Sequence, residues 1–329
     1  MIAPRLSDVP GSRMIKGIHH AALSVLDLDR AVRYFTKGAG LVVERRWRLS
    51  APDDGGDAVL LRGPNGFVEL QCHLGPDRGA PADRPVSAAG ITHLCFQHQS
   101  IEELFAGFTQ AGAAPHAAPV ALGTGYHYSY VRDAETNVLE LEGNPVAPPP
   151  RGPWLSHVSL STPDVDRLAG FYAGLLGRGI RSAGQFGPNP LIDRITRLEG
   201  TRVRVAWLDA CNIGLEIMQY LNPPTLAERH ERKVSAPGYS LVCFEVDDLA
   251  SELKRLEGLG VRLLGSASRG EDGMIAFGRD PDGNLLKFVE FTATSRSRSL
   301  DTLSDPAALH RADAAMAESR AQPQESTSA

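Results

Sequence analysis

The stretch Gly-Ile-His-His-Ala-Ala-Leu-Ser-Val at residues 17–25 has the period-two alternation of a β-strand with one buried face. Asp27 follows it and precedes an amphipathic segment, as an N-cap residue precedes a helix. The same order of strand, acidic or serine cap and helix begins again at Gly90, Trp154 and Gly238. The chain is therefore predicted to contain four copies of one module.

Each module also ends in the same way, with a turn-rich stretch before a last apolar strand. Gly-Pro-Asn-Gly at residues 63–66 precedes Phe-Val-Glu-Leu, and Asp-Pro-Asp-Gly-Asn at residues 280–284 precedes Leu-Leu-Lys-Phe. Between helix and last strand there is room for two more strands. Each copy is therefore predicted to be a β-α-β-β-β unit, and the fold class to be α+β.

The Pro-rich stretch at residues 145–153 divides the four modules into two pairs, as a stiff linker would. We expect a first domain at residues 15–145, a linker at 146–153 and a second domain at 154–293. Residues 1–14 are expected to form a flexible arm. Residues 294–329, rich in Ser, Ala, Arg, Asp and Gln, are expected to be a disordered tail with a helical stretch near 306–320.

Composition excludes several classes of protein. The 329 residues include 34 Lys and Arg against 39 Asp and Glu, and a net charge of −5 disfavours nucleic-acid binding. No run of 18 apolar residues and no signal peptide is seen, so a cytoplasmic protein is expected. The four cysteines are far apart without a C-x-x-C pair, which disfavours a zinc ribbon or a thioredoxin-like site.

Three of the four modules carry a His on the first strand and a Glu on the last strand at matching positions. A lone His or Glu in a strand is more often structural, but the recurrence of both indicates shared chemistry. Imidazole and carboxylate groups are common ligands of divalent metals, and a buried carboxylate is costly unless it is paired or metal-bound. The pairs are His20 with Glu69, His93 with Glu140, and His157 with Glu216, whereas the fourth module has Leu241 and Lys287.

With these residues the chain resembles the vicinal-oxygen-chelate superfamily of glyoxalase I, methylmalonyl-CoA epimerase, extradiol dioxygenases and fosfomycin or bleomycin resistance proteins. The resemblance covers residues 15–292 and rests on residues 17–25, Phe-Glu-Val-Asp-Asp at 244–248 and Arg-Asp-Pro-Asp-Gly-Asn-Leu at 279–285. It implies that two modules form a cupped sheet around one divalent metal ion, so that four modules form two such sheets. Carried over to neighbouring modules, it implies that one Zn, Ni, Co, Mn or Fe ion is bound by His20, Glu69, His93 and Glu140.

Two pairings of the modules are compatible with the sequence. If neighbours pair, the metal site lies in the first domain and the second domain has lost its site, with a Glu216–Lys287 ion pair as one way to fill the space. If modules two and three pair, His93, Glu140, His157 and Glu216 form an equally complete set. Neighbouring pairing is commoner in the family and fits the linker, so it is the arrangement that we expect. The second domain would then be structural, dimerising or a lid.

The resemblance leaves three functions open. Two His and two Glu resemble the isomerase and lyase branch, where a redox-inert metal binds two adjacent substrate oxygens and Glu69 or Glu140 moves a proton. The rival is an iron(II) ring-cleaving dioxygenase. Tyr130, ten residues before Glu140, resembles the catalytic Tyr of the extradiol signature, although Ala134 and Thr136 depart from it. The third is a small-molecule-binding protein without turnover. The expected partner is a small molecule with adjacent oxygens, with a homodimer as a further option.

Overall fold

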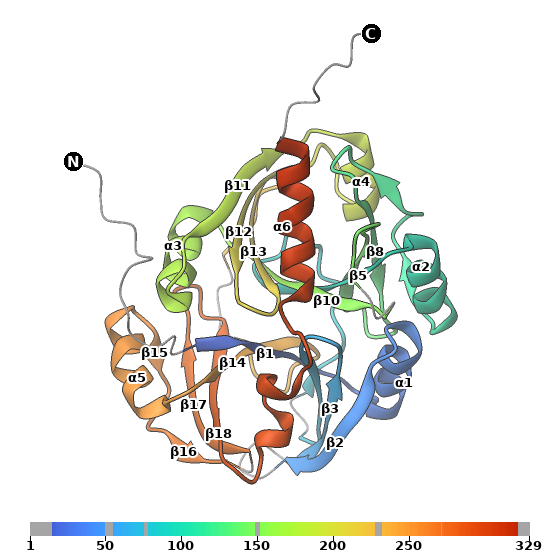
Figure 1. Ribbon diagram of the computed structural model, residues 1–329. Helices are drawn as coiled ribbons and strands as arrows, with labels where there is room; N and C mark the ends of the chain where they lie inside the picture. The colour runs from blue at the N-terminus through green and yellow to red at the C-terminus, as the bar shows by residue number, and fades with distance from the viewer. Residues whose placement is uncertain are drawn as a thin grey trace, which may run out of the picture.

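The computed structural model describes residues 15–49, 55–75, 78–148, 152–227, 232–270 and 272–321. Two nine-stranded sheets curve away from each other, with helices along their flanks (Figure 1). The predicted α+β class, with four modules paired into two cupped sheets, is confirmed. No helix within these ranges is long and apolar enough to span a membrane.

Sheet A is built from the first and fourth modules. Its strand order is β15-β17-β18-β14-β1-β4-β3-β2, with β16 beside β17. The first module comprises β1 (Ile15–Ser24), α1 (Leu28–Gly38), β2 (Val42–Leu49), β3 (Gly56–Arg62) and β4 (Phe67–His73). The fourth comprises β14 (Gly238–Val246), α5 (Leu249–Gly258), β15 (Arg262–Leu263), β16 (Ser268–Arg269), β17 (Gly273–Arg279) and β18 (Leu285–Phe291).

Sheet B is built from the second and third modules. Its strand order is β11-β12-β13-β10-β5-β9-β8-β6, with β7 beside β8. The second module comprises β5 (Gly90–His98), α2 (Ile101–Gln110), β6 (Ala114–Pro115), β7 (Val120–Ala121), β8 (His127–Arg132) and β9 (Val138–Gly143). The third comprises β10 (Trp154–Ser161), α3 (Val165–Leu176), β11 (Ile180–Phe186), α4 (Pro190–Thr196), β12 (Arg202–Asp209) and β13 (Gly214–Asn222).

This pairing corrects the expected division into domains at 15–145 and 154–293. β5 runs antiparallel to β10, and β1 runs antiparallel to β14, so each sheet combines modules from both expected domains. The physical reason lies in the described ends of the segment between β9 and β10, which are bonded close to sheet B. Asn144 N–H donates to His98 O, and Trp154 Nε1 donates to Pro148 O, so these ends do not hold modules two and three apart.

The helix that follows the first strand of each module begins at the polar residue that the sequence indicated. Asp27, Ser100, Asp164 and Asp248 each accept a hydrogen bond from the backbone N–H three residues later. At one flank α1 packs against α2, and at the other Arg255 of α5 donates to the carbonyls that end α3. The helices therefore join a module of sheet A to a module of sheet B at both flanks.

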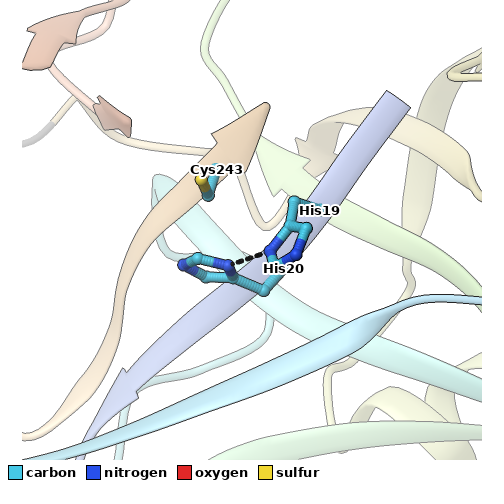
Figure 2. A group of neighbouring side chains, drawn as sticks. All are labelled: His19, His20 and Cys243. Atoms are coloured by element: carbon cyan, nitrogen blue, oxygen red, sulfur yellow. Dashed lines mark hydrogen bonds between the residues drawn. The ribbon is translucent and has the colours of Figure 1, made fainter. Parts of the chain in front are cut away.

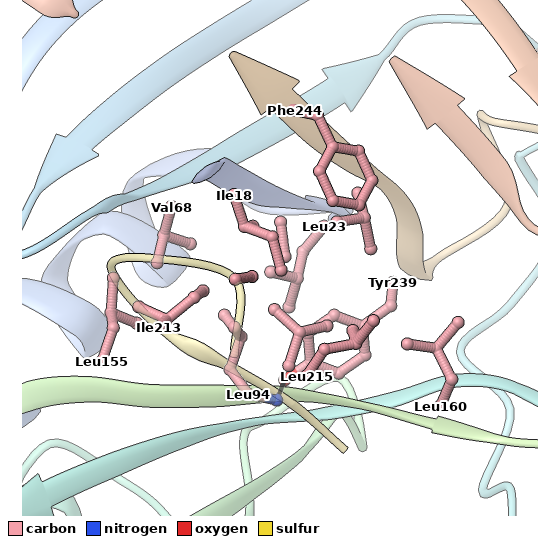
Figure 3. Packing of buried hydrophobic residues seen from close by; sticks show 14 of the residues in the cluster. Ile18, Leu23, Val68, Leu94, Leu155, Leu160, Ile213, Leu215, Tyr239 and Phe244 are labelled. Atoms are coloured by element: carbon pink, nitrogen blue, oxygen red, sulfur yellow. Dashed lines mark hydrogen bonds between the residues drawn. The ribbon is translucent and has the colours of Figure 1, made fainter. Parts of the chain in front are cut away.

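The apolar faces of the two sheets form one continuous core (Figure 3). Ile18, Leu23 and Phe244 contribute from sheet A, and Leu94 and Leu155 from sheet B. Because this core is shared, burial of apolar area stabilises both sheets together.

A pair of asparagines joins the sheets at one end of this core. Asn212 donates from Nδ2 to Ile18 O and Asn65 O, and its Oδ1 accepts from Ile18 N–H. Asn65 makes the reciprocal set, donating to Leu155 O and Asn212 O and accepting from Leu155 N–H. Both side chains are buried, so these bonds fix the first strand of one sheet against a turn of the other.

Residues 294–321 after β18 are folded, which corrects the expectation of disorder there and agrees with the helical stretch expected near 306–320; residues 322–329 lie outside the described residues. The folded segment contains η3 (Arg296–Arg298), η4 (Leu300–Thr302) and α6 (Ala308–Ala321). Leu300, Leu303 and Leu309 are buried against the sheets, which gives the segment enough apolar contact to stay ordered. Residues 1–14, expected to be a flexible arm, lie outside the described part of the chain.

Replacing Asn212 by Ala removes three buried hydrogen bonds and leaves both backbone groups of Ile18 without their partner. We expect the free energy of unfolding to fall by about 3 kcal/mol, from roughly 1 kcal/mol for each bond. Urea denaturation of Asn212→Ala measures the loss. The exposed Gln185 of β11 provides the control, because Gln185→Ala should change stability by less than about 0.5 kcal/mol. A loss below about 1 kcal/mol in Asn212→Ala would contradict the role given to this side chain.

Candidate metal centre

The register of sheet B brings four ligand-type side chains to its concave face, which we call cup B. His93 on β5 lies opposite Ser159, and His157 on β10 lies opposite Cys95. In the parallel pairs, Cys95 lies beside Glu140 and Ser159 beside Glu216. Since side chains alternate across a strand, His93, Glu140, His157 and Glu216 all point into cup B.

The four side chains form one compact group. His93 Nε2 and His157 Nε2 lie 3.2 and 3.0 Å from Glu140 Oε2, and both lie 3.6 Å from Glu216 Oε2. One ligand atom from each of the four lies within 4.8 Å of all the others, and all four residues are buried. The donor set is two imidazole nitrogens and two carboxylate oxygens, one of each from either module.

The charges of this group are strongly coupled. Burial disfavours the imidazolium form, yet the hydrogen bond to Glu140 and the nearby carboxylates raise the pKa of His157 to about 9. Burial also opposes ionisation of Glu140, but the hydrogen bonds from His157 and His93 lower its pKa to about 2. Burial raises the pKa of Glu216, and the charge of Glu140 adds to this. Without a metal ion, a proton on His157 therefore partly balances the two carboxylates.

Glu216 shows best that a cation would fit between these side chains. Its Oε2 atom is buried and has no hydrogen-bond partner among the described residues. A buried carboxylate oxygen without a donor is costly, and a divalent cation between the two imidazoles and two carboxylates would remove that cost. Zinc, nickel, cobalt, manganese and iron all accept this mixture of nitrogen and oxygen ligands, so the residues present fit such an ion.

The two imidazoles are held by groups behind them. Ser156 Oγ lies 3.3 Å from His157 Nδ1 and donates to Glu142 Oε2 at 3.0 Å. Thr92 Oγ1 lies 3.2 Å from His93 Nδ1. Such contacts to the outer ring nitrogen orient histidine ligands in metal sites. Burial, followed by the charge of Glu140, raises the pKa of Glu142 to about 7.

Aromatic side chains form the walls of cup B. Tyr130 on β8 lies opposite Glu140, with its ring centroid 5.1 Å from that of His93. Trp207 on β12 lies opposite Glu216, with its ring centroid 4.9 Å from that of His157. The structure thus places Tyr130, predicted as a candidate catalytic residue, beside the four-ligand group.

Helix α6 crosses the open side of cup B (Figure 1). Asp313 on this helix accepts hydrogen bonds from Asn144 Nδ2 at 3.0 Å and from Tyr126 Oη at 3.1 Å. Asn144 also donates to Gln97, and Gln97 donates to Glu142. A chain of hydrogen bonds therefore connects α6 to the side chains next to the candidate ligands.

His20 and Glu69, which the sequence assigned to the same site as His93 and Glu140, lie in the concave face of sheet A, called cup A here. This is a correction, and its cause is the pairing of module one with module four. His20 Nε2 lies 3.1 Å from Glu69 Oε2, and Lys287 Nζ lies 3.8 Å from the same oxygen. Lys287 is therefore the partner of Glu69, and the suggested Glu216–Lys287 pair does not occur because those residues belong to different sheets.

The ionisation of cup A differs from that of cup B. Burial alone would raise the pKa of Glu69, but the Lys287 ammonium and His20 hold it well below its usual range. Burial lowers the pKa of His20. Burial also opposes the charged form of Lys287, but Glu69 raises its pKa overall. Cup A therefore holds a neutral imidazole and an internal ion pair.

A second buried group in cup A contains His19, His20 and Cys243 (Figure 2). His19 Nδ1 and His20 Nδ1 are 2.7 Å apart, so the two rings satisfy each other by a hydrogen bond. His19 Nε2 contacts Arg298 O at 2.8 Å, and its ring stacks on Phe67. His19 therefore holds the His20 ring in place.

Comparison with known proteins is consistent with this architecture. The Glyoxalase/Bleomycin resistance protein/Dioxygenase superfamily model matches residues 17–141 and again residues 154–288. Glyoxalase I from Zea mays has a TM-score of 0.63 and 20% identity, over 88% of this chain and 96% of that one. A candidate dioxygenase from Bacillus subtilis has a TM-score of 0.59 and 12% identity, over 89% and 91%. No curated protein sequence is a significant match. At these identities the structural likeness concerns the fold.

Metal binding in cup B should release a proton, because the ligand form of His157 is the neutral imidazole. With its pKa near 9, His157 carries a proton at pH 7.5, so about one proton should leave for each metal ion bound. Below pH 9 the apparent affinity should then rise about tenfold for each pH unit. Calorimetric titration in buffers of different ionisation enthalpy measures the released proton. An affinity that is constant between pH 6.5 and 8.5 would show that His157 is already neutral.

The same proton predicts how the metal-free protein responds to pH. A pKa raised from 6.5 to about 9 means that the proton stabilises the fold fully below pH 6.5, and that this contribution is lost as pH rises through 9. We therefore expect the melting temperature of the metal-free protein to fall between pH 7 and pH 9.5. His157→Ala should lose this part of the pH dependence, as measured by thermal denaturation after treatment with a chelator.

Proposed function

The chain belongs to the glyoxalase/bleomycin resistance protein/dioxygenase superfamily, and we propose that it is a metal-dependent enzyme with its metal centre in cup B. The observation that carries this proposal is the group of His93, Glu140, His157 and Glu216, in which one buried carboxylate oxygen accepts no hydrogen bond from the part of the chain that the structure describes. These four residues replace the ligand set that the sequence favoured. They are the ligands expected from the alternative in which modules two and three pair.

The reaction that the residues support best is proton transfer at a carbon next to a carbonyl, as in an isomerase, epimerase or lyase. A divalent metal ion held by the four ligands would supply Lewis-acid polarisation of two adjacent substrate oxygens. The chain must supply a base that accepts the carbon-bound proton and returns it. All four donors fit one redox-inert ion, which favours this reaction over those that need open metal positions for oxygen.

Of the two carboxylates, Glu216 is better suited to carry the proton. Glu140 is held by hydrogen bonds from both imidazoles, which lower its pKa and keep it ionised. Glu216 Oε2 accepts no hydrogen bond from the described residues and burial raises the pKa of this carboxyl, so it can take up a proton at lower cost. We therefore assign the base to Glu216 and the anchoring carboxylate to Glu140.

The walls of cup B define the class of substrate. Tyr130, Met218 and Tyr220 form a buried cluster next to the ligands. The hydroxyl of Tyr220 has no hydrogen-bond partner within the described residues and can donate to a substrate oxygen. A small molecule with two adjacent oxygens and an apolar remainder fits this environment, in which water is excluded from the reacting carbon.

The second candidate is a ring-cleaving iron(II) dioxygenase, and the position of Tyr130 favours it. The Tyr130 ring lies beside His93 and opposite Glu140, where it could contact a bound phenolic substrate. Such enzymes use two His and one carboxylate with open positions for oxygen. One carboxylate of cup B would then have to leave the metal, which makes this the less favoured function.

Metal analysis of matched His variants tests the location of the centre. Protein purified anaerobically without added metal should contain about one divalent ion per chain. His157→Ala should contain less than a tenth of this amount, because a ligand is lost, whereas His20→Ala should keep the full amount. The reverse result would place the metal in cup A.

The identity of the metal separates the candidate functions. Near one iron per chain would favour the dioxygenase, and oxygen uptake with catechols would then be measured. Absence of metal even after loading would leave a binding protein.

The proposed base is tested by hydrogen exchange. With 2-hydroxycarbonyl compounds in D₂O, Glu216→Gln should reduce deuterium incorporation next to the carbonyl by a factor of about 100 or more. Metal content should be largely retained, because three ligands and the amide oxygen remain. Glu69→Gln is the matched control, since Glu69 occupies the equivalent strand position in cup A. Equal exchange rates for Glu216→Gln and the wild type would exclude Glu216 as the base.

A further inference from the structure

Cup A repeats the backbone geometry of cup B residue by residue. His20 lies opposite Cys243, as His157 lies opposite Cys95. In the parallel pairs Ala22 lies beside Glu69, as Ser159 lies beside Glu216. Two more pairs correspond in the same way. Ala22 lies opposite Leu241, as Ser159 lies opposite His93. Cys243 lies beside Lys287, as Cys95 lies beside Glu140. Relative to cup B, Leu241 therefore replaces a histidine ligand and Lys287 replaces a glutamate ligand.

Half of a metal site is preserved in cup A. His20 Nε2 lies 3.1 Å from Glu69 Oε2, which is closer than the 3.6 Å between His157 Nε2 and Glu216 Oε2, and it forms no hydrogen bond within the described residues. His19 contacts the outer nitrogen of His20 in the way that Ser156 contacts that of His157 (Figure 2). One nitrogen and one oxygen donor thus remain close together, and His19 fixes the orientation of the His20 ring.

Lys287 supplies the positive charge at that point. Its side chain is only 14% exposed, and its Nζ lies 3.8 Å from Glu69 Oε2. An ammonium group carries one charge and donates hydrogen bonds, so it can satisfy a carboxylate oxygen that would otherwise need a metal ion. The C-terminal segment also covers cup A next to Lys287. Arg298 O contacts His19, and Ser299 Oγ donates a hydrogen bond to Glu245.

We propose that the Lys287 ammonium occupies the cation position of cup A, so that the chain has two equivalent cation sites and fills one of them with its own side chain. The comparison rests on the metal centre proposed for cup B. It follows that the wild-type chain binds one divalent ion and not two. It also follows that Leu241→His together with Lys287→Glu converts cup A into a second metal site with the same four donor types.

Metal stoichiometry tests this conversion. Each protein is refolded with Zn²⁺, Ni²⁺ or Mn²⁺, because cup A is buried, and is then dialysed and analysed by mass spectrometry of the elements. The wild type should hold one ion per chain and the double variant two. Leu241→His alone is the matched control and should stay at one ion, because the ammonium remains.

The His157→Ala background separates this inference from the proposed function. In that background the two cup A substitutions should raise the metal content from near zero to one ion per chain, independently of cup B. If the wild type holds no metal but the double variant holds one ion, the function proposed for cup B fails, whereas the assignment of Lys287 to the cation position of cup A stands. A folded double variant that gains no ion overturns the inference, whatever cup B binds.

A single substitution covers the case in which the double variant does not fold. Lys287→Ala removes the ammonium and leaves His20 and Glu69 as a two-ligand site. Both proteins are first saturated with metal in cup B. Raising Zn²⁺ to millimolar concentration should then increase the melting temperature of Lys287→Ala further, whereas the melting temperature of the wild type should stay constant. An unchanged melting temperature in Lys287→Ala would show that the ammonium does not stand in a cation position.

Discussion

The antiparallel pairing of β5 with β10 is the interaction on which the candidate metal centre depends. It places the first strands of modules two and three side by side and fixes His93 and His157 on the same concave face. Each last strand then adds its glutamate from the outer side of its own module. A shift of the register by one residue would turn one module's ligands toward the core, so the shared core that fixes the register also protects the site.

The same geometry creates an electrostatic problem that the two cups solve differently. Two buried carboxylates cannot both remain ionised in an apolar cup without compensating positive charge. Cup B compensates with a proton on His157 that a metal ion can displace, and one oxygen of Glu216 still accepts no hydrogen bond from any described residue. Cup A has exchanged one carboxylate for Lys287, which makes the compensation permanent. A replaceable charge suits a site of chemistry, whereas a permanent one suits a site whose role is to hold the fold.

The repeats, the helix caps and the ligand positions could be predicted from sequence because each depends on local pattern. Period-two alternation determines which face His20 or His93 occupies, and Asp27 or Ser100 determines where a helix begins. The partner strand is not encoded locally: β1 has the same pattern whether it pairs with β5 or with β14. The Pro-rich stretch indicated a spacer, but Asn144 bonds to His98 and Trp154 bonds to Pro148, and no local pattern reveals these bonds. Leu300 and Leu309 likewise stabilise the C-terminal segment only through contacts with distant strands.

Joining four modules in one chain allows the two cups to differ. In a symmetric dimer of two-module chains, a substitution such as Leu241 for histidine would appear in both cups and remove both centres. Here it appears only in cup A, and the C-terminal segment can therefore treat the cups unequally. It packs Ser299 and Leu300 firmly against sheet A and then lays α6 over cup B through the polar contacts of Asp313. Leu309 adds a buried apolar contact with Trp154, but the polar contacts with Asn144 and Tyr126 are easier to exchange for water, which suits the function proposed for cup B.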